Sequence, residues 1–225
     1  MSNIKVMASA AFREAYLELL PEFERTSGHR VTNTWVPSVQ MMNRLKGGET
    51  TDVVILSDAA LAELIQAGVV AERFPLAKSG IGIAVRSGAA HPDIRSSEAV
   101  KRAVLAAQSV AYSTGPSGIY LRALFEKMGI ADQIEGKVRQ VQGEPAGAVV
   151  ARGEAEIGFQ QMSELLPVAG IEIVGPLPHE IQEITVFSAG LHARAEEPTA
   201  ARALIAFLKA PAAAPVIRKN GMEPV

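Results

Sequence analysis

Three places in the sequence combine serine with small residues where a predicted strand gives way to a predicted helix. They are Ser9-Ala10-Ala11, Pro37-Ser38-Val39 and Pro116-Ser117-Gly118. The first backbone N–H groups of a helix have no partner inside it, and the helix dipole adds about half a positive charge there. Small side chains let a ligand approach these groups, and serine hydroxyls add donors. The sequence therefore predicts places that could bind an anion without lysine or arginine.

The same residues also have a purely structural explanation. Serine is a common helix N-cap, and glycine is common in turns. A fourth junction, Ser57-Asp58, fits this explanation better than the other three, because Asp58 would repel an anion. Both explanations stay open for any single junction, but three such junctions in one chain favour an anion site.

The junctions lie in a pattern of alternating strands and helices, which is typical of α/β folds with crossover helices between parallel strands. Because they occur in both halves of the chain, we expect two α/β lobes facing each other across a cleft, although a single doubly wound sheet is an alternative. Strands are predicted at 4–8, 30–36, 52–56, 80–85, 109–112, 137–141, 155–160, 171–174 and 183–190, and helices at 11–28, 39–48, 59–68, 96–107, 119–129, 143–153 and 199–210.

Composition excludes several classes of protein. The chain has 225 residues, 48% of them hydrophobic and 20% charged, as in ordinary globular proteins. A net charge of −2 without a basic run argues against nucleic acid. The absence of cysteine excludes disulfides and thiolate metal sites. No apolar stretch approaches the roughly 20 residues of a membrane span, so we expect no membrane insertion. No signal peptide is recognisable before the first strand, which leaves the compartment open.

Few other residues suggest chemistry. His29, His91, His179 and His192 are not paired at metal-binding spacing and are expected on the surface, and no Walker, Rossmann, H-E-x-x-H or nucleophile-elbow pattern occurs. We therefore expect neither metal nor cofactor.

Glu144 precedes Pro145 beside the expected cleft, where burial and a bound polyanion would both raise its pKa. It is a candidate base or an ordinary loop residue. Arg13, Arg44, Arg86 and Tyr120 could reach a ligand, but solvated or core roles suit them as well.

The order and spacing of several segments along nearly the whole chain resemble the type 2 periplasmic solute-binding proteins. Within them, the chain is most similar to the molybdate-binding protein family of ABC transporters. The segments are VMASAAFREAY, PSVQMMNRL, TDVVILSDAALAELIQAG, PSGIYLRALFEKMG, GAVVARGEAEIGF and ARALIAFLKAPAAAPVIRKNG.

The resemblance implies two lobes, each with a mixed, mostly parallel sheet, that close over ligand by hinge bending. Lobe 1 would comprise residues 1–80 and 187–225 and lobe 2 residues 81–186, with crossover strands near 80–86 and 183–190. It also implies a monomer that works with an ABC permease in the periplasm, although the missing signal peptide keeps the cytoplasm as an alternative.

The ligand positions of the family agree only in part. In the molybdate binders, hydroxyls, helix-start amides and one tyrosine hydroxyl hold the oxyanion. Ser38 and Ser117 match, but the first serine falls at Ala11, an amide position falls at Pro145, which has no N–H, and the tyrosine falls at Gln161. These departures from the family pattern, and the amide groups of Gln160 and Gln161 in place of a phenol, predict a small organic acid rather than molybdate. The candidate ligand-binding residues are Ser9, Ala10, Ala11, Ser38, Ser117, Gly118, Pro145, Gln160 and Gln161.

Three functions follow from these observations. The leading one is a solute-binding protein that holds a small anion, carboxylate or oxyanion, for uptake and does no chemistry. The alternative is a cofactor-free isomerase of a small polycarboxylate, of the aconitate isomerase type, which resembles the same family and would need a base such as Glu144. A regulatory ligand-binding domain ranks last, because such domains usually follow a helix-turn-helix and this chain opens on its first strand.

Overall fold

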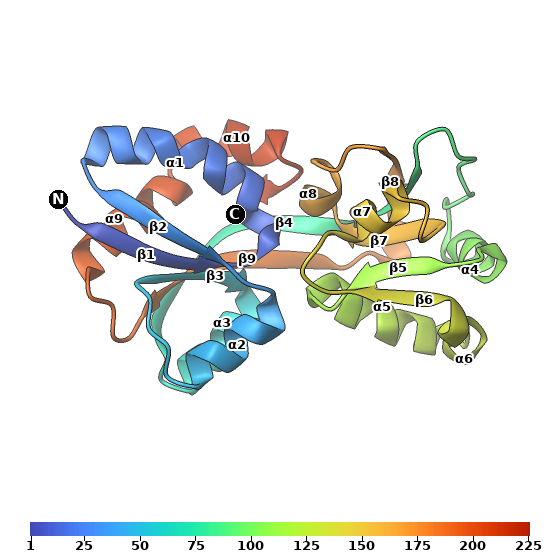
Figure 1. The fold of residues 1–225 in the computed structure, drawn as a ribbon, viewed down its shortest axis with the longest axis horizontal. Helices are drawn as coiled ribbons and strands as arrows, with labels where there is room; N and C mark the ends of the chain where they lie inside the picture. The colour runs from blue at the N-terminus through green and yellow to red at the C-terminus, as the bar shows by residue number, and fades with distance from the viewer. The chain divides into compact units, whose positions relative to one another are not determined.

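The computed structural model describes all 225 residues, which separate into two compact α/β units. Unit 1 comprises residues 1–79 and 185–225, and unit 2 comprises residues 80–184. Strands β4 (Val70–Arg86) and β9 (Ile184–His192) cross the boundary and are hydrogen-bonded to each other. Each unit has a mixed sheet with helices on both faces, which confirms the predicted fold class (Figure 1).

In unit 1 the strand order is β2-β1-β3-β9. Strand β1 (Asn3–Ala8) pairs in parallel with β2 (Arg30–Trp35) and β3 (Val53–Ser57), and β9 pairs antiparallel with β3. Successive side chains of β3 enter opposite cores, because strand residues alternate between faces. One face carries α1 (Arg13–Ser27), α9 (Pro198–Lys209) and α10 (Ala214–Lys219), and the other α2 (Ser38–Lys46) and α3 (Asp58–Gln66). The short strand β10 (Glu223–Pro224) pairs with β4.

In unit 2 the order is β4-β7-β5-β6, with β8 (Ile171–Pro176) also paired to β4. Strands β5 (Val110–Ser113), β6 (Val138–Val141) and β7 (Ile157–Gln161) are parallel to one another. Helices α4 (Ser97–Ala106), α5 (Pro116–Lys127) and α6 (Ala131–Ile134) cover one face, and α7 (Ala146–Ala151) the other, beside α8 (Met162–Leu165) (Figure 1). Short 3-10 segments lie at residues 10–12, 135–137, 179–181 and 211–213.

The parallel strands bring the starts of several helices to one edge of each sheet. In unit 1 the 3-10 segment 10–12, α2 and α3 follow the carboxyl ends of β1, β2 and β3. In unit 2, α5, α7 and α8 follow the carboxyl ends of β5, β6 and β7. In open α/β sheets this edge is where ligands bind, because helix N-termini converge there.

Several elements differ from the sequence-based prediction, among them α6, α8 and β10, which it does not contain. The strand expected at 80–85 is the last third of β4, which begins ten residues earlier at Val70. That first part carries Pro75 and three charged residues, which hide its strand character in the sequence. The segment after α9, to which the sequence analysis assigns no element, contains α10. No single helix is long and apolar enough to cross a membrane; only α9 taken together with residues 211–219, at a bend of 55°, meets the length and composition test.

The close approach of α5 to the end of β5 gives a first testable prediction. A Cβ added to Gly118 would lie 1.6 Å from the carbonyl oxygen of Ser113. Gly118→Ala gains about 0.5–1 kcal/mol of helix propensity, but overpacking of this kind costs about 1–3 kcal/mol or more, so the variant should melt at a lower temperature. In Gly136→Ala, the control, the new Cβ has no neighbour within 4 Å, and its melting temperature should stay within error of the wild type. Equal melting temperatures for both variants would contradict the described packing.

Candidate functional site

The first predicted junction places a buried hydroxyl at the end of β1. The backbone N–H of Ser9 donates to the carbonyl of Ile55 at 3.0 Å, which fixes the residue against β3. Its side chain is 5% exposed, and its Oγ has no hydrogen-bond partner. Ala10 and Ala11 form the 3-10 segment that follows, and Ser9 does not cap it through its side chain. Ser9 is therefore a buried donor that the fold leaves unused.

At the second junction Ser38 is the first residue of α2, and Pro37 occupies the N-cap. Proline has no side-chain acceptor, so α2 begins without a side-chain cap hydrogen bond. Ser38 is partly buried and Val39 is exposed. The start of this nine-residue helix thus keeps its N–H groups free of side-chain caps.

Two other serines show what a structural cap looks like in this chain. The Oγ of Ser57 accepts from the N–H of Ala60 at 3.4 Å, and the Oγ of Ser96 accepts from that of Ala99 at 3.1 Å. Asp58 accepts from Ser188 Oγ at 2.8 Å and pairs with Arg73 at 3.0 Å. The structural interpretation of the Ser57-Asp58 junction is confirmed, and neither Ser9 nor Ser117 behaves in this way.

The third junction repeats the first one in unit 2. Ser117 is the second residue of α5, its side chain is 1% exposed, and its Oγ has no partner. Gly115 is the N-cap of α5 and supplies no side-chain hydrogen bond. Because Gly118 lacks a Cβ, the first turn of α5 can lie against the carbonyl of Ser113. Each unit therefore has a buried, unused serine hydroxyl at a strand-to-helix junction.

Gln160 connects the starts of α7 and α8 at the same edge of the unit 2 sheet. Pro145 is the N-cap of α7, and the N–H of Ala146 donates to Gln160 Oε1 at 2.6 Å. Gln160 Nε2 in turn donates to Glu164 Oε1 at 2.9 Å. Both amide atoms of Gln160 are thus engaged within the protein. The neighbouring Gln161 is fully buried at the last position of β7.

The prediction of a raised pKa for Glu144 is wrong. Arg152 makes a bidentate ion pair with this carboxylate, at 2.8 and 3.0 Å, and the pairing lowers the pKa of Glu144. The side chain is exposed on the loop before α7. Of the two interpretations open from the sequence, the ordinary loop glutamate fits these contacts.

Sequence reasoning missed two polar residues in α8. Ser163 is 4% exposed and its Oγ has no partner. Glu164 is partly buried, and burial raises its pKa to about 7, although the hydrogen bond from Gln160 lowers the pKa. The signal was present as Gln-Gln-Met-Ser-Glu, which begins on the last residue of a predicted strand. These polar residues lie at the same kind of junction as Ser117.

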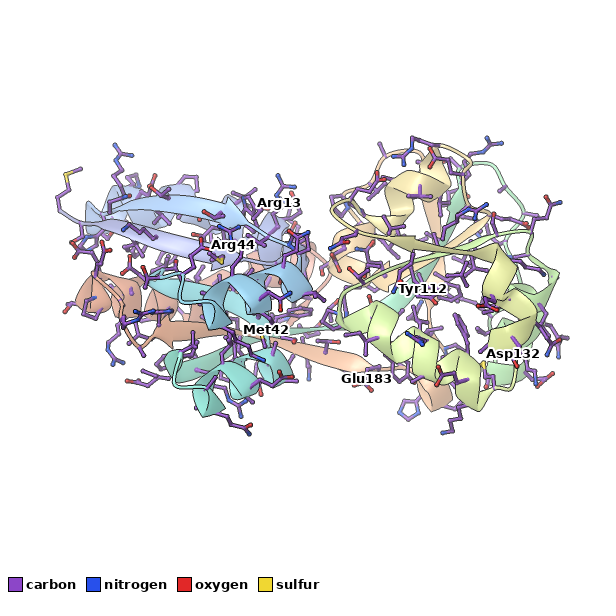
Figure 2. The ribbon with its side chains drawn as sticks, turned by 60° about the horizontal axis from the view of Figure 1, so that its bottom comes forward. Arg13, Met42, Arg44, Tyr112, Asp132 and Glu183 are labelled. Atoms are coloured by element: carbon purple, nitrogen blue, oxygen red, sulfur yellow. The ribbon has the colours of Figure 1, made fainter.

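The remaining candidates have structural roles. Arg13 lies over the ring of Trp35, at 5.4 Å from its centroid, and Arg44 donates to Glu49 at 2.6 Å (both arginines are labelled in Figure 2). Arg86 is exposed. The hydroxyl of Tyr120 donates a hydrogen bond to the carbonyl of Ile181 at 2.9 Å.

His192, expected on the surface, is instead 2% exposed, and burial lowers its pKa. No group of three potential metal ligands occurs.

Comparison with known proteins gives consistent matches over the whole chain. The profile of the family described as bacterial extracellular solute-binding protein matches residues 4–223. An aconitate isomerase from Pseudomonas sp is 40% identical over 233 aligned positions, covering 100% of this chain and 89% of that protein. The molybdate-binding protein ModA of Azotobacter vinelandii is 26% identical and covers 98% of this chain and 89% of its own length.

Solved structures agree with this fold. The periplasmic molybdate-binding protein of Azotobacter vinelandii superposes with a TM-score of 0.80 at 19% identity, over 97% of this chain and 98% of that one. The sulfate-binding protein SubI of Mycobacterium tuberculosis H37Rv gives a TM-score of 0.78 at 17% identity, over 100% of this chain and 88% of its own. At such identities these likenesses concern the fold alone.

The contrast between the capping serines and the unused ones gives a second prediction. Ser117→Ala removes a buried hydroxyl that makes no hydrogen bond, so the free energy of unfolding without ligand should stay unchanged or rise. Ser96→Ala removes an N-cap and should lower it by about 1 kcal/mol. Urea titration of both variants measures the difference. If Ser117→Ala lowers the free energy of unfolding as much as Ser96→Ala does, the Ser117 hydroxyl stabilises the fold and the prediction is wrong.

Proposed function

Because the chain belongs to the family of bacterial extracellular solute-binding proteins, we propose that it binds a small organic polycarboxylate and interconverts the cis and trans isomers of aconitate. The geometric observation that carries the binding part is the pair of buried serine hydroxyls, Ser9 in unit 1 and Ser117 in unit 2, that no protein group uses.

The serine hydroxyls suit an anionic ligand for an energetic reason. A buried polar group without a partner costs about 1–3 kcal/mol, and a ligand oxygen that accepts from the hydroxyl removes this cost. Uncapped helix starts at α2 and α5 add backbone N–H groups and a favourable dipole. No lysine or arginine is needed, so the ligand would be recognised by the placement of its oxygens.

A polycarboxylate suits the site better than a tetrahedral oxyanion. At the position where the resemblance to molybdate binders implies an amide, Pro145 has no N–H, and the next N–H, of Ala146, is taken by Gln160. Gln161 stands where those proteins have a tyrosine. The relative named aconitate isomerase is also more similar in sequence, at 40% identity, than the molybdate-binding relative at 26%.

The reaction itself needs no cofactor. Aconitate has a methylene group next to a carbon–carbon double bond, and removal of one methylene proton leaves an allylic carbanion that the carboxylates stabilise. Return of a proton to the other end of the allyl system moves the double bond, and its geometry depends on the conformation held by the site. No redox step occurs, so the protein must supply only orientation and a base.

The second candidate function is binding without chemistry, in which the protein holds an organic acid for an ABC permease in the periplasm. The molybdate-binding relatives, which match nearly the whole chain, favour it. The two candidates share the ligand site and differ only in turnover.

Proton NMR separates the two candidates. We expect the wild type to convert trans-aconitate into cis-aconitate and to exchange the methylene protons in D2O. Ser117→Ala should raise KM by about ten- to a hundredfold, since each lost hydrogen bond to a charged ligand is worth about 1.5–3 kcal/mol. Ser96→Ala, which lies outside the site, is the control and should retain the wild-type KM.

Binding of aconitate by calorimetry without conversion or exchange at high protein concentration would reject the isomerase and leave the carrier. Absence of both binding and turnover would reject the polycarboxylate as ligand.

A further inference from the structure

We infer that Glu164 is the base that removes and returns the ligand proton, a step that rests on the isomerase activity proposed above. The role of base was first considered for Glu144, but the carboxylate of Glu144 is paired with Arg152. The inference depends on where Glu164 lies, how it is held and which charges surround it.

Glu164 lies at the edge of the unit 2 sheet where the proposed ligand groups gather. Strand β7 ends at Gln161, and α8, which contains Glu164, begins at the next residue. Because β5 and β7 are parallel, with Tyr112 opposite Phe159, the starts of α5 and α8 follow the same edge. Ser117 therefore belongs to the same edge as Glu164.

Gln160 holds the carboxyl group in place. Its Nε2 donates to Glu164 Oε1 at 2.9 Å, and its own orientation is fixed by the N–H of Ala146, which donates to Gln160 Oε1 at 2.6 Å. This arrangement leaves the second carboxyl oxygen, Oε2, outside the hydrogen bond to Gln160. Glu164 makes no salt bridge, and part of the residue remains exposed.

The surroundings contain no charge that would fix the protonation state of Glu164. Strand β7 and helix α7, which both contact α8, contain no titratable residue. In β4, which packs on α8 at Gly82, the charged residue of unit 2 is Arg86, at the end away from Gln161. Glu172 of β8 is engaged by Gly88 and His91, and Glu144 and Glu154 by Arg152.

Burial is the main influence on the acidity of Glu164, and it raises the pKa to about 7 although the hydrogen bond from Gln160 lowers it. A carboxyl group of this pKa is ionised in about half of the molecules at neutral pH and binds a proton more strongly than an ordinary glutamate. Both properties suit a group that must take a proton from carbon and give it back.

The proposed step balances without any co-reactant. The C–H bond of the methylene breaks, the proton goes to Glu164, and the electron pair enters the allyl system and its carboxylates. The same proton, or one exchanged with water, then forms a C–H bond at the other end, and the carboxylate is regenerated. One carboxyl group on one face of the ligand can serve both ends.

The test compares E164Q with the matched control E144Q. Glutamine keeps the size and the hydrogen bond to Gln160 but cannot take a proton. We expect E164Q to lose at least about a hundredfold in kcat and in methylene deuterium exchange, while calorimetry shows that it still binds citrate, a tricarboxylate without the double bond. E144Q should retain the wild-type kcat and exchange rate.

A pH profile gives a readout that a structural role would not move. For the wild type, kcat/KM should fall about tenfold for each pH unit below about 7, because the protonated carboxyl of Glu164 cannot act as a base, and it should level off above that pH. The residual activity of E164Q should lack this dependence, while ionisation of the ligand affects both proteins alike.

The possible failures are distinguishable. A wild type that isomerises aconitate together with an equally active E164Q overturns the assignment of Glu164 and leaves the isomerase. Loss of citrate binding in E164Q along with activity shows that the residue serves binding and also overturns the assignment. A wild type that binds but neither isomerises nor exchanges deuterium contradicts the proposed activity, and the role of Glu164 falls with it.

Discussion

The ligand site that we propose depends on serine hydroxyl groups that lie at strand-to-helix junctions and make no hydrogen bond within the protein. Ser9 and Ser117 are buried without a partner for their hydroxyls, in a chain whose Ser57 and Ser96 show that a serine at such a place can cap its own helix. Leaving them unpaired costs free energy in the empty protein. A ligand with acceptor oxygens recovers that cost on binding, and the parallel strands determine where the acceptors must lie.

The second constraint concerns the other face of the unit 2 sheet, where α7 and α8 begin. Pro145 supplies no N–H, and Gln160 uses the first available one, that of Ala146, to orient itself toward Glu164. The first N–H of α7 therefore orients Gln160, which holds the carboxyl group of Glu164, and does not bind an oxyanion. The same exchange explains how one fold can carry an oxyanion in some members of a family and, as we propose, move a proton on an organic acid in another.

Much of the fold could be predicted from the sequence, because β-branched runs such as that of β3 and serine or glycine at helix boundaries are local signals. The first part of β4 could not, since Pro75 and neighbouring charges mask a strand that pairing with β10 stabilises. The strand-to-helix junctions with serine and small residues could be located for the same local reason, and their binding of an anion stays a prediction. Glu144 and Glu164 show the limit: whether a glutamate pairs with Arg152 or is buried beside Gln160 is decided by tertiary contacts, which spacing along the chain does not reveal.

The central claim is that this site, which needs no lysine or arginine, binds a polycarboxylate, and a thermal-shift panel tests it most directly. Only ligands that prefer the folded state raise the melting temperature, so cis-aconitate, trans-aconitate and citrate can be compared with molybdate, tungstate, sulfate and phosphate at equal ionic strength. The account predicts stabilisation by the tricarboxylates and none by the tetrahedral oxyanions. Stabilisation by the oxyanions alone would contradict it and would make the protein a carrier of such ions despite Pro145 and Gln161.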